Sequence, residues 1–168
     1  MNDAEIIELA GRVGSALRAN GAVLATAESC TGGLIVGAIT EIAGSSGWFD
    51  RAMVTYSDAA KVEMLGVAQD CLDAHGAVSE PTARAMALGA LQRSRATIAV
   101  AVTGVAGPGG GSAAKPVGMV CFGWAIRNGS ATTETQHFPG DRAVVRAMTV
   151  RHALLGILKR LDSNPAGR

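Results

Sequence analysis

Aromatic side chains are scarce in this chain, at 4% of its 168 residues, and positive charge is not concentrated anywhere along it. Without a basic stripe interleaved with aromatic rings, and with a formal net charge of +1, the sequence does not predict direct binding to nucleic acid. Hydrophobic residues nevertheless make up 48% of the chain and charged residues 17%. This balance predicts one globular domain over residues 1–168 with a well-buried core.

Cysteine is also rare, and no long hydrophobic run is present. Cys30, Cys71 and Cys121 are odd in number and lack metal-ligand spacing, which favours a reducing compartment over a disulfide framework. The chain opens Met-Asn-Asp-Ala-Glu, unlike a secretory signal, and it has no apolar run of 18 residues. We therefore expect a cytoplasmic protein without a membrane span.

Motifs for metals and common cofactors are missing as well. His75, His137 and His152 are scattered, with no His-Glu-x-x-His or Cys-x-x-Cys, so the sequence predicts no metal site. The glycine-rich segment 104–115 lacks the Gly-Lys-Ser/Thr ending of a nucleotide-binding P-loop, and no Gly-x-Gly-x-x-Gly fingerprint follows a strand. We expect no cofactor.

Two glycine-rich turns are what the chain does contain, at residues 26–33 and 103–111, each after a short apolar run. Glycine lets the backbone approach a ligand closely, while free amides and the Ser and Thr hydroxyls can face a phosphate, carboxylate or oxyanion. Two such turns at one sheet edge predict a small-molecule pocket.

Hydrophobic periodicity and turn signals divide the chain into helices and strands. Helices are predicted over residues 3–20, 34–43, 58–65, 67–75, 82–93 and 141–161, and strands over 22–27, 51–57, 97–102, 118–127 and 130–138. Asp58 and Ser79 are expected helix caps, and residues 163–168 an unstructured tail. The order predicts an α/β fold in which a mixed β-sheet is covered by helices on both faces, with ligands bound where strand ends meet helix starts.

Six ordered motifs carry a resemblance to a known family over roughly residues 5–160. They are Thr-Ala-Glu-Ser-Cys-Thr-Gly-Gly at 26–33, Ile-Ala-Gly-Ser-Ser-Gly-Trp-Phe at 42–49, Val-Thr-Tyr-Ser at 54–57 with Lys61, Gly-Ala-Val-Ser-Glu-Pro at 76–81, Thr-Gly-Val-Ala-Gly-Pro at 103–108 and Lys-Pro-Val-Gly at 115–118. Together they resemble the carboxy-terminal domain of the competence/damage-inducible protein CinA, whose stand-alone forms are nicotinamide-nucleotide amidases. The resemblance implies hydrolysis of nicotinamide mononucleotide to nicotinic acid mononucleotide and ammonia.

Amide hydrolysis needs a nucleophile and a base to activate it. Lys61 is one of three lysines and lies inside a shared motif, and a desolvated lysine can serve as base near neutral pH. Ser29, at a strand-to-helix turn, and Ser46, in a Gly-Ser-Ser-Gly loop, are both candidate nucleophiles, and the residues alone do not decide between them. The resemblance favours Ser46 with Lys61, leaving Ser29, Tyr56 and Thr103 to orient the amide, hold the lysine or stabilise the oxyanion.

Cys30 is a rival nucleophile, because a thiol at a helix amino terminus has a lowered pKa, although no histidine lies near it in the motifs. We expect a larger set of residues to bind the substrate. Within it, the glycine loop and an arginine at the start of a helix would bind the phosphate. Its members are Thr31, Gly32, Gly33, Thr103, Gly104, Gly107, Gly109 and Arg142.

A second hypothesis is a regulatory module that binds a nucleotide without turning it over. Ser46 and Lys61 within hydrogen-bond reach beside a pocket would favour the enzyme, whereas positions on different sides of the sheet would favour the binding module. The alanine- and glycine-rich composition indicates close helix packing and leads us to expect a homo-oligomer.

Overall fold

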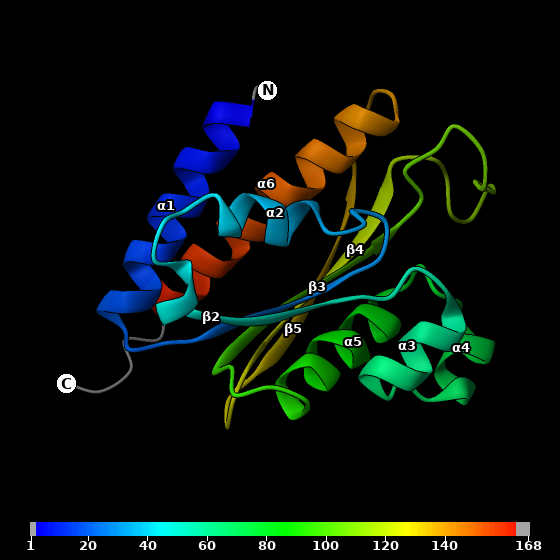
Figure 1. The fold of residues 1–168 in the computed structure, drawn as a ribbon. Coiled ribbons are helices and arrows are strands. Elements are labelled where there is room, and N and C mark those ends of the chain that lie inside the picture. Colours follow the sequence, from blue (N-terminus) through cyan, green and yellow to red (C-terminus); the bar gives the residue numbers. More distant parts are fainter. Residues whose placement is uncertain (1–2, 164–168) are drawn as a thin grey trace.

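The computed structural model describes residues 3–163, which form one mixed five-stranded sheet with helices on both faces (Figure 1). The strands lie in the order β2-β1-β3-β4-β5, with β1 parallel to β2 and β3, and with β4 antiparallel to both β3 and β5. Their bounds are β1 Leu24–Glu28, β2 Phe49–Val54, β3 Ile98–Gly104, β4 Met119–Ile126 and β5 Ala131–His137. The predicted fold class is confirmed.

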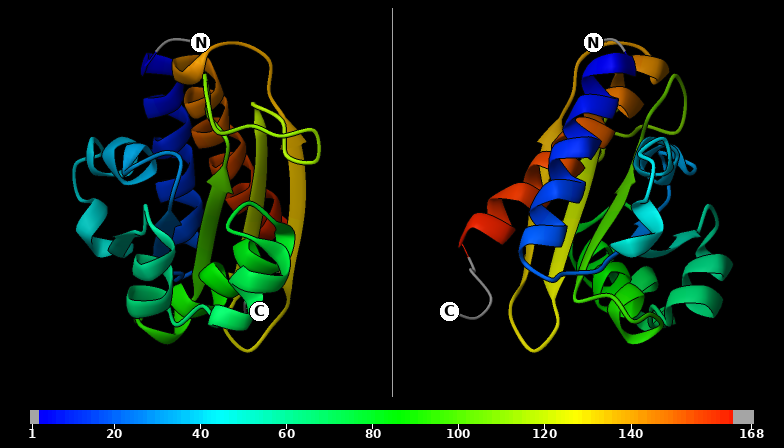
Figure 2. Two further views of the ribbon diagram at one scale, coloured as in Figure 1. Left: turned by 90° about the vertical axis from the view of Figure 1, so that its right-hand side faces the viewer. Right: turned by 60° about the vertical axis from the view of Figure 1, so that its left-hand side comes forward.

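Helices form a layer on each side of this sheet, as Figures 1 and 2 show. One layer holds α1 (Asp3–Ala19), α2 (Leu34–Thr40) and α6 (Arg142–Ser163), and the other holds α3 (Asp58–Leu65), α4 (Gln69–His75) and α5 (Glu80–Gln92). A short 3-10 turn, η1 (Ser45–Gly47), precedes β2. Of the tail predicted for residues 163–168, Ser163 ends α6 and the others lie outside the described residues.

Strand periodicity explains why both faces of the sheet are covered. Successive side chains of a strand point to opposite faces. In β3, Ile98, Val100 and Val102 pack toward α1 and α6, whereas Ala99 and Ala101 pack toward α5. The α5 face is lined mostly by alanine and the other by larger side chains, so α5 lies close against the sheet.

Side-chain caps begin two of the helices on the α5 face. Ser79 accepts a hydrogen bond from the Thr82 amide at the start of α5, as predicted. The cap of α3 is Ser57, which accepts from the Ala60 amide, and Asp58 is the first helical residue. The prediction of Asp58 as the cap was therefore wrong by one residue, and the shift leaves its carboxylate in the first turn of the helix.

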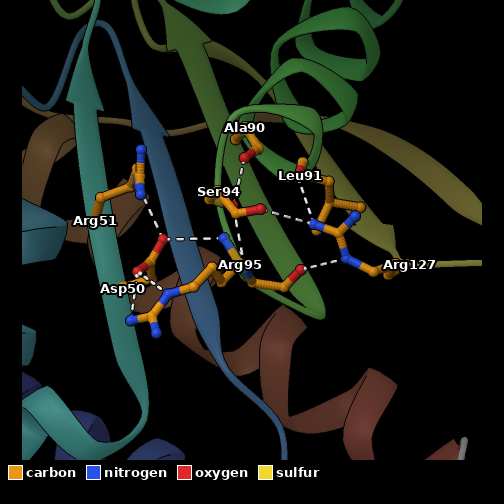
Figure 3. Close-up of polar contacts among 8 residues, drawn as sticks. Asp50, Arg51, Ala90, Leu91, Ser94, Arg95 and Arg127 are labelled. Carbon is orange, nitrogen blue, oxygen red and sulfur yellow. Dashed lines mark hydrogen bonds and ion pairs between the residues drawn. The ribbon is translucent and has the colours of Figure 1, made fainter.

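A charged cluster ties together the end of the sheet where β2 begins (Figure 3). Asp50 accepts hydrogen bonds from the guanidinium groups of Arg51 (2.8 Å) and Arg95 (3.2 Å) and from the Arg95 amide (3.1 Å). Arg127 donates to the carbonyls of Leu91 and Ser94 beside it. These contacts anchor β2 and β4 to the loop between α5 and β3.

The opposite end of the sheet depends on one buried carboxylate. Glu28 is the last residue of β1, has no solvent exposure, and accepts hydrogen bonds from the amides of Gly33 (3.0 Å), Ile35 (3.0 Å) and Val36 (2.8 Å) and from the Thr31 hydroxyl (2.7 Å). Because the first amides of a helix have no partner within it, this side chain satisfies the start of α2.

Replacing Glu28 should destabilise the whole protein. Glu28→Ala leaves several buried donors without an acceptor, which we expect to lower the free energy of unfolding by about 3 kcal/mol or more. Urea unfolding followed by circular dichroism measures the change. Glu41→Ala removes an exposed carboxylate at the other end of α2 and should change stability by no more than about 0.5 kcal/mol. Equal losses in the two variants would contradict this role of Glu28.

Candidate active site

The carboxyl ends of β1, β2 and β3 meet at one edge of the sheet, and a cavity of about 240 Å³ opens there. This is the place where ligands bind in open α/β sheets. The lining residues come from both glycine-rich turns, the start of α3, the loop before α5 and the start of α6. They are Ser29, Cys30, Tyr56, Asp58, Lys61, Ala77, Val78, Thr103, Gly104, Ala106 and Arg142.

Ser29 and Lys61 are in direct contact in this cavity. The Lys61 side chain is 1% exposed, and its Nζ donates to the Ser29 Oγ (3.1 Å) and to the Thr55 carbonyl (2.9 Å). Burial lowers the pKa of Lys61 below its ordinary value, and the nearby Asp58 carboxylate opposes this shift. A lysine held in this way can lose its proton more easily and accept one from the serine.

Ser46 does not lie near Lys61. It is an exposed residue of η1, immediately before β2, whereas Lys61 lies in α3, which follows β2. The six residues of β2 separate the two positions by roughly 20 Å at about 3.3 Å per residue. The expected pair of Ser46 and Lys61 is therefore corrected, because the hydroxyl beside the lysine is that of Ser29.

Arg142 connects two other predicted residues at the mouth of the cavity. Its Nη2 donates to the Tyr56 hydroxyl (2.8 Å) and its Nη1 to the Gly107 carbonyl (2.9 Å). Tyr56 is 62% exposed, so its ring forms part of the rim. At the cavity wall, Thr103 is buried and donates through Oγ1 to the Ala77 carbonyl (2.8 Å).

Five of the expected substrate-binding residues lie outside the cavity lining: Thr31, Gly32, Gly33, Gly107 and Gly109. The Thr31 hydroxyl and the Gly33 amide both donate to Glu28, and the Gly32 amide donates to the Ser29 carbonyl (3.0 Å). Gly109 is exposed in the long loop. The first three groups therefore build the turn that carries Ser29, because their polar atoms are already used within the fold.

Cys30 lines the cavity, but its thiol is poorly suited to be the nucleophile. Its side chain is buried, and burial raises the pKa of Cys30 to about 12. None of the three histidines, all of them within the described residues, lines the cavity. The thiol therefore stays protonated and packs as a small apolar group.

Sequence reasoning missed Glu28, Thr55 and Asp58 as parts of this site. Glu28 fixes the turn that follows Ser29, the Thr55 carbonyl holds Lys61, and Asp58 lies in the cavity with the lysine. An acidic residue at the end of an otherwise apolar strand was a usable signal for Glu28. A backbone carbonyl such as that of Thr55 leaves no trace in side-chain patterns.

Among residues 3–163, no group of three or more His, Cys, Asp or Glu side chains is arranged to hold a metal ion. Within the same range, no helix has both the length and the apolar character needed to cross a bilayer.

Comparison with known proteins gives consistent matches over nearly the whole chain. The CinA C-terminal domain family matches residues 6–161. The nicotinamide-nucleotide amidohydrolase PncC of Escherichia coli K12 is 51% identical over 164 residues, covering 98% of this chain and 99% of the relative. A CinA-like protein of Akkermansia muciniphila is 54% identical over 141 residues, covering 84% of this chain and 34% of that longer protein.

Solved structures agree with these relatives. The competence/damage-inducible protein CihA of Agrobacterium tumefaciens superposes with a TM-score of 0.90 at 52% identity, covering 96% of this chain and 97% of that chain. A CinA superfamily protein of Escherichia coli superposes with a TM-score of 0.89 at 38% identity, covering 95% of this chain and 93% of that one. The chain belongs to the CinA C-terminal domain family.

Proposed function

We propose that this protein hydrolyses the carboxamide of nicotinamide mononucleotide, with Ser29 as nucleophile and Lys61 as general base. The observation that carries the proposal is the buried Lys61 Nζ at 3.1 Å from the Ser29 Oγ, inside a cavity at the carboxyl end of the sheet. The names of the PncC relatives, at 51% identity over almost their full length, support the choice of substrate.

The reaction can be written with these two side chains and water. Neutral Lys61 takes the Ser29 proton as the Oγ attacks the carboxamide carbon, which forms a tetrahedral intermediate. The C–N bond then breaks, and the Lys61 ammonium returns the proton to the departing nitrogen, releasing ammonia. Lys61 then deprotonates a water molecule as its oxygen attacks the resulting ester, and the Lys61 ammonium returns that proton to the departing Ser29 Oγ. The carboxylic acid formed gives its proton to the released ammonia, which yields the carboxylate and ammonium.

Arg142 is placed to bind the phosphate of the substrate. Arg142 lines both the cavity and an adjoining hollow of about 410 Å³. With the carboxamide at Ser29, the ribose and phosphate extend past Tyr56 toward this arginine, whose planar fork suits a phosphate. Arg142 also opens α6, where the helix dipole favours an anion.

Ammonia release from nicotinamide mononucleotide tests the proposal and separates the two serines. Ser29→Ala and Lys61→Ala should each lower kcat by about 10³-fold or more, because the nucleophile or its base is lost. Lys61→Arg should be equally inactive, since a guanidinium keeps the charge but cannot act as a base.

Ser46→Ala is the matched control, a serine at the far end of β2, and should keep kcat within about twofold of the unmodified protein. Loss of activity in this variant with retention in Ser29→Ala would contradict the assignment. Binding of the nucleotide without ammonia release by the unmodified protein would replace the enzyme with a regulatory nucleotide-binding module.

Removing the charge of Asp58 should shift the pH dependence of activity toward acid. The base must be neutral, so kcat rises as the pH passes through the pKa of Lys61. Burial lowers this pKa, and the Asp58 carboxylate raises it by a smaller amount. Asp58→Asn removes the negative charge that raises the pKa of Lys61, so the rising limb of the pH–kcat profile should move to lower pH. A limb that stays in place or moves to higher pH would contradict Lys61 as the base.

Arg142 should determine the preference for a phosphorylated substrate. Arg142→Ala should raise KM for nicotinamide mononucleotide by about 30-fold or more and change the reaction of nicotinamide riboside, which lacks the phosphate, far less. Arg151→Ala, an exposed arginine of the same helix outside the cavity, serves as the control and should leave both KM values unchanged. An equal effect of Arg142→Ala on both substrates would rule out the phosphate contact.

A further inference from the structure

The hydrogen-bond direction along β3 shows where each of its amides points. On the β4 side, the Arg127 amide donates to the Thr97 carbonyl (2.8 Å) and the Val105 amide donates to the Met119 carbonyl (2.9 Å). In an antiparallel pair the bonded residues alternate, so the odd-numbered residues of β3 bond to β4. The even-numbered residues must then direct their amides and carbonyls toward β1.

Contacts on the β1 side agree with this alternation. The Ile98 amide donates to the Val23 carbonyl (3.1 Å), and the Ser29 amide donates to the Val102 carbonyl (3.0 Å). The next even-numbered residue is Gly104, so its amide points past the end of β1, at the level of Ser29.

Gly104 has no strand opposite it on that side. The ladder acceptor in its path would be the Ser29 carbonyl, but this carbonyl accepts the Gly32 amide (3.0 Å) as the chain turns into α2, and among residues 3–163 no hydrogen bond joins it to the Gly104 amide. Ser29 and Gly104 both line the cavity. The Gly104 N–H therefore faces the cavity beside the serine hydroxyl.

This amide is held rigidly in place. A Cβ at residue 104 would lie 2.8 Å from the Met119 carbonyl oxygen and 2.8 Å from a methyl group of Val120, so the backbone packs directly against β4. The following residue is fixed from both sides, since Val105 donates to Met119 and accepts from the Gly118 amide (2.8 Å). A donor positioned before the reaction needs no reorganisation as charge develops.

We propose that the Gly104 amide stabilises the oxyanion of the tetrahedral intermediate formed at Ser29. As the Oγ–carbon bond forms and the Ser29 proton passes to Lys61, the electron pair of the carbonyl π bond moves to its oxygen, which becomes negative. The Gly104 N–H donates a hydrogen bond to that oxygen and keeps its own proton. The bond relaxes when the carbonyl re-forms and the C–N bond breaks. This role rests on the proposed function of Ser29 and Lys61.

Replacing the amide by an ester tests the role without altering any side chain. Glycolic acid incorporated at position 104 by suppressor-tRNA translation removes the N–H and keeps the shape of the chain. We expect kcat for nicotinamide mononucleotide to fall by about 10²- to 10³-fold with little change in KM, because the bond forms only as charge develops. The melting temperature should stay close to that of the unmodified protein, since the lost N–H faces the cavity.

The hydroxy-acid analogue of Ile98 is the matched control. It removes an amide of the same strand that also points to β1 but donates to Val23 at the far end. It weakens the preceding carbonyl as the 104 ester does, but it also loses the hydrogen bond to Val23, so it should lower the melting temperature more than the 104 ester and leave kcat within about twofold. A 104 ester that folds and keeps kcat within about threefold of the unmodified protein overturns the proposal.

A spectroscopic measurement covers the case in which the 104 ester does not fold. Pyridine-3-boronic acid forms a tetrahedral adduct with an active serine, and the Gly104 amide proton of the ¹⁵N-labelled protein should then move downfield. An adduct on Ser29 without this shift also overturns the proposal. If the unmodified protein releases no ammonia, both the proposed function and the role of Gly104 are wrong. If the unmodified protein and the 104 ester are equally active, only the role of Gly104 is wrong.

Discussion

The hydrogen bonds to the Glu28 carboxylate hold together the end of the sheet at which the candidate chemistry lies. The side chain is entirely out of water and is satisfied by the first amides of α2 and by the Thr31 hydroxyl. Its own carbonyl accepts the Thr55 amide (2.8 Å), and the Thr55 carbonyl in turn holds Lys61. Because neighbouring residues of a strand point to opposite faces, anchoring Glu28 toward α2 directs Ser29 toward α3 and its lysine.

Lys61 is held between two opposing influences. Burial among the walls of the cavity disfavours its charged form, while the carboxylate of Asp58, one turn earlier in α3, favours it. Its hydrogen-bond partners are oxygen atoms of Ser29 and Thr55, neither of them a carboxylate, so within residues 3–163 no ion pair holds the ammonium. The same burial that favours the neutral form of the lysine is a cost to the fold, because a charged group without a buried counter-ion is expensive to desolvate.

Much of this arrangement was predictable from the sequence. The alternation of elements and the Asn128-Gly129 turn between β4 and β5 predicted the mixed, doubly covered sheet, and the two glycine-rich turns lie at the edge where the cavity opens. The sequence also contained the information that Ser46 and Lys61 lie apart. Ser46 precedes the second predicted strand and Lys61 follows it, so the two residues lie at opposite ends of that strand. Contacts made by backbone atoms, such as the Thr55 carbonyl, could not be predicted, because side-chain patterns carry no record of them.

The unequal lengths of adjacent strands create the cavity. Glu28, the last residue of β1, pairs with Val54 at the end of β2 and with Val102 of β3. β3 continues through Thr103 and Gly104, supported beyond that point only by β4. The overhanging residues supply one wall of the cavity and an amide directed across it, while the turn after β1 supplies the serine hydroxyl. On one side of β3 the parallel strand β1 ends early, and on the other side the antiparallel strand β4 continues. The backbone polar groups at the end of β3 are therefore exposed to a ligand, while the rest of the sheet stays regular.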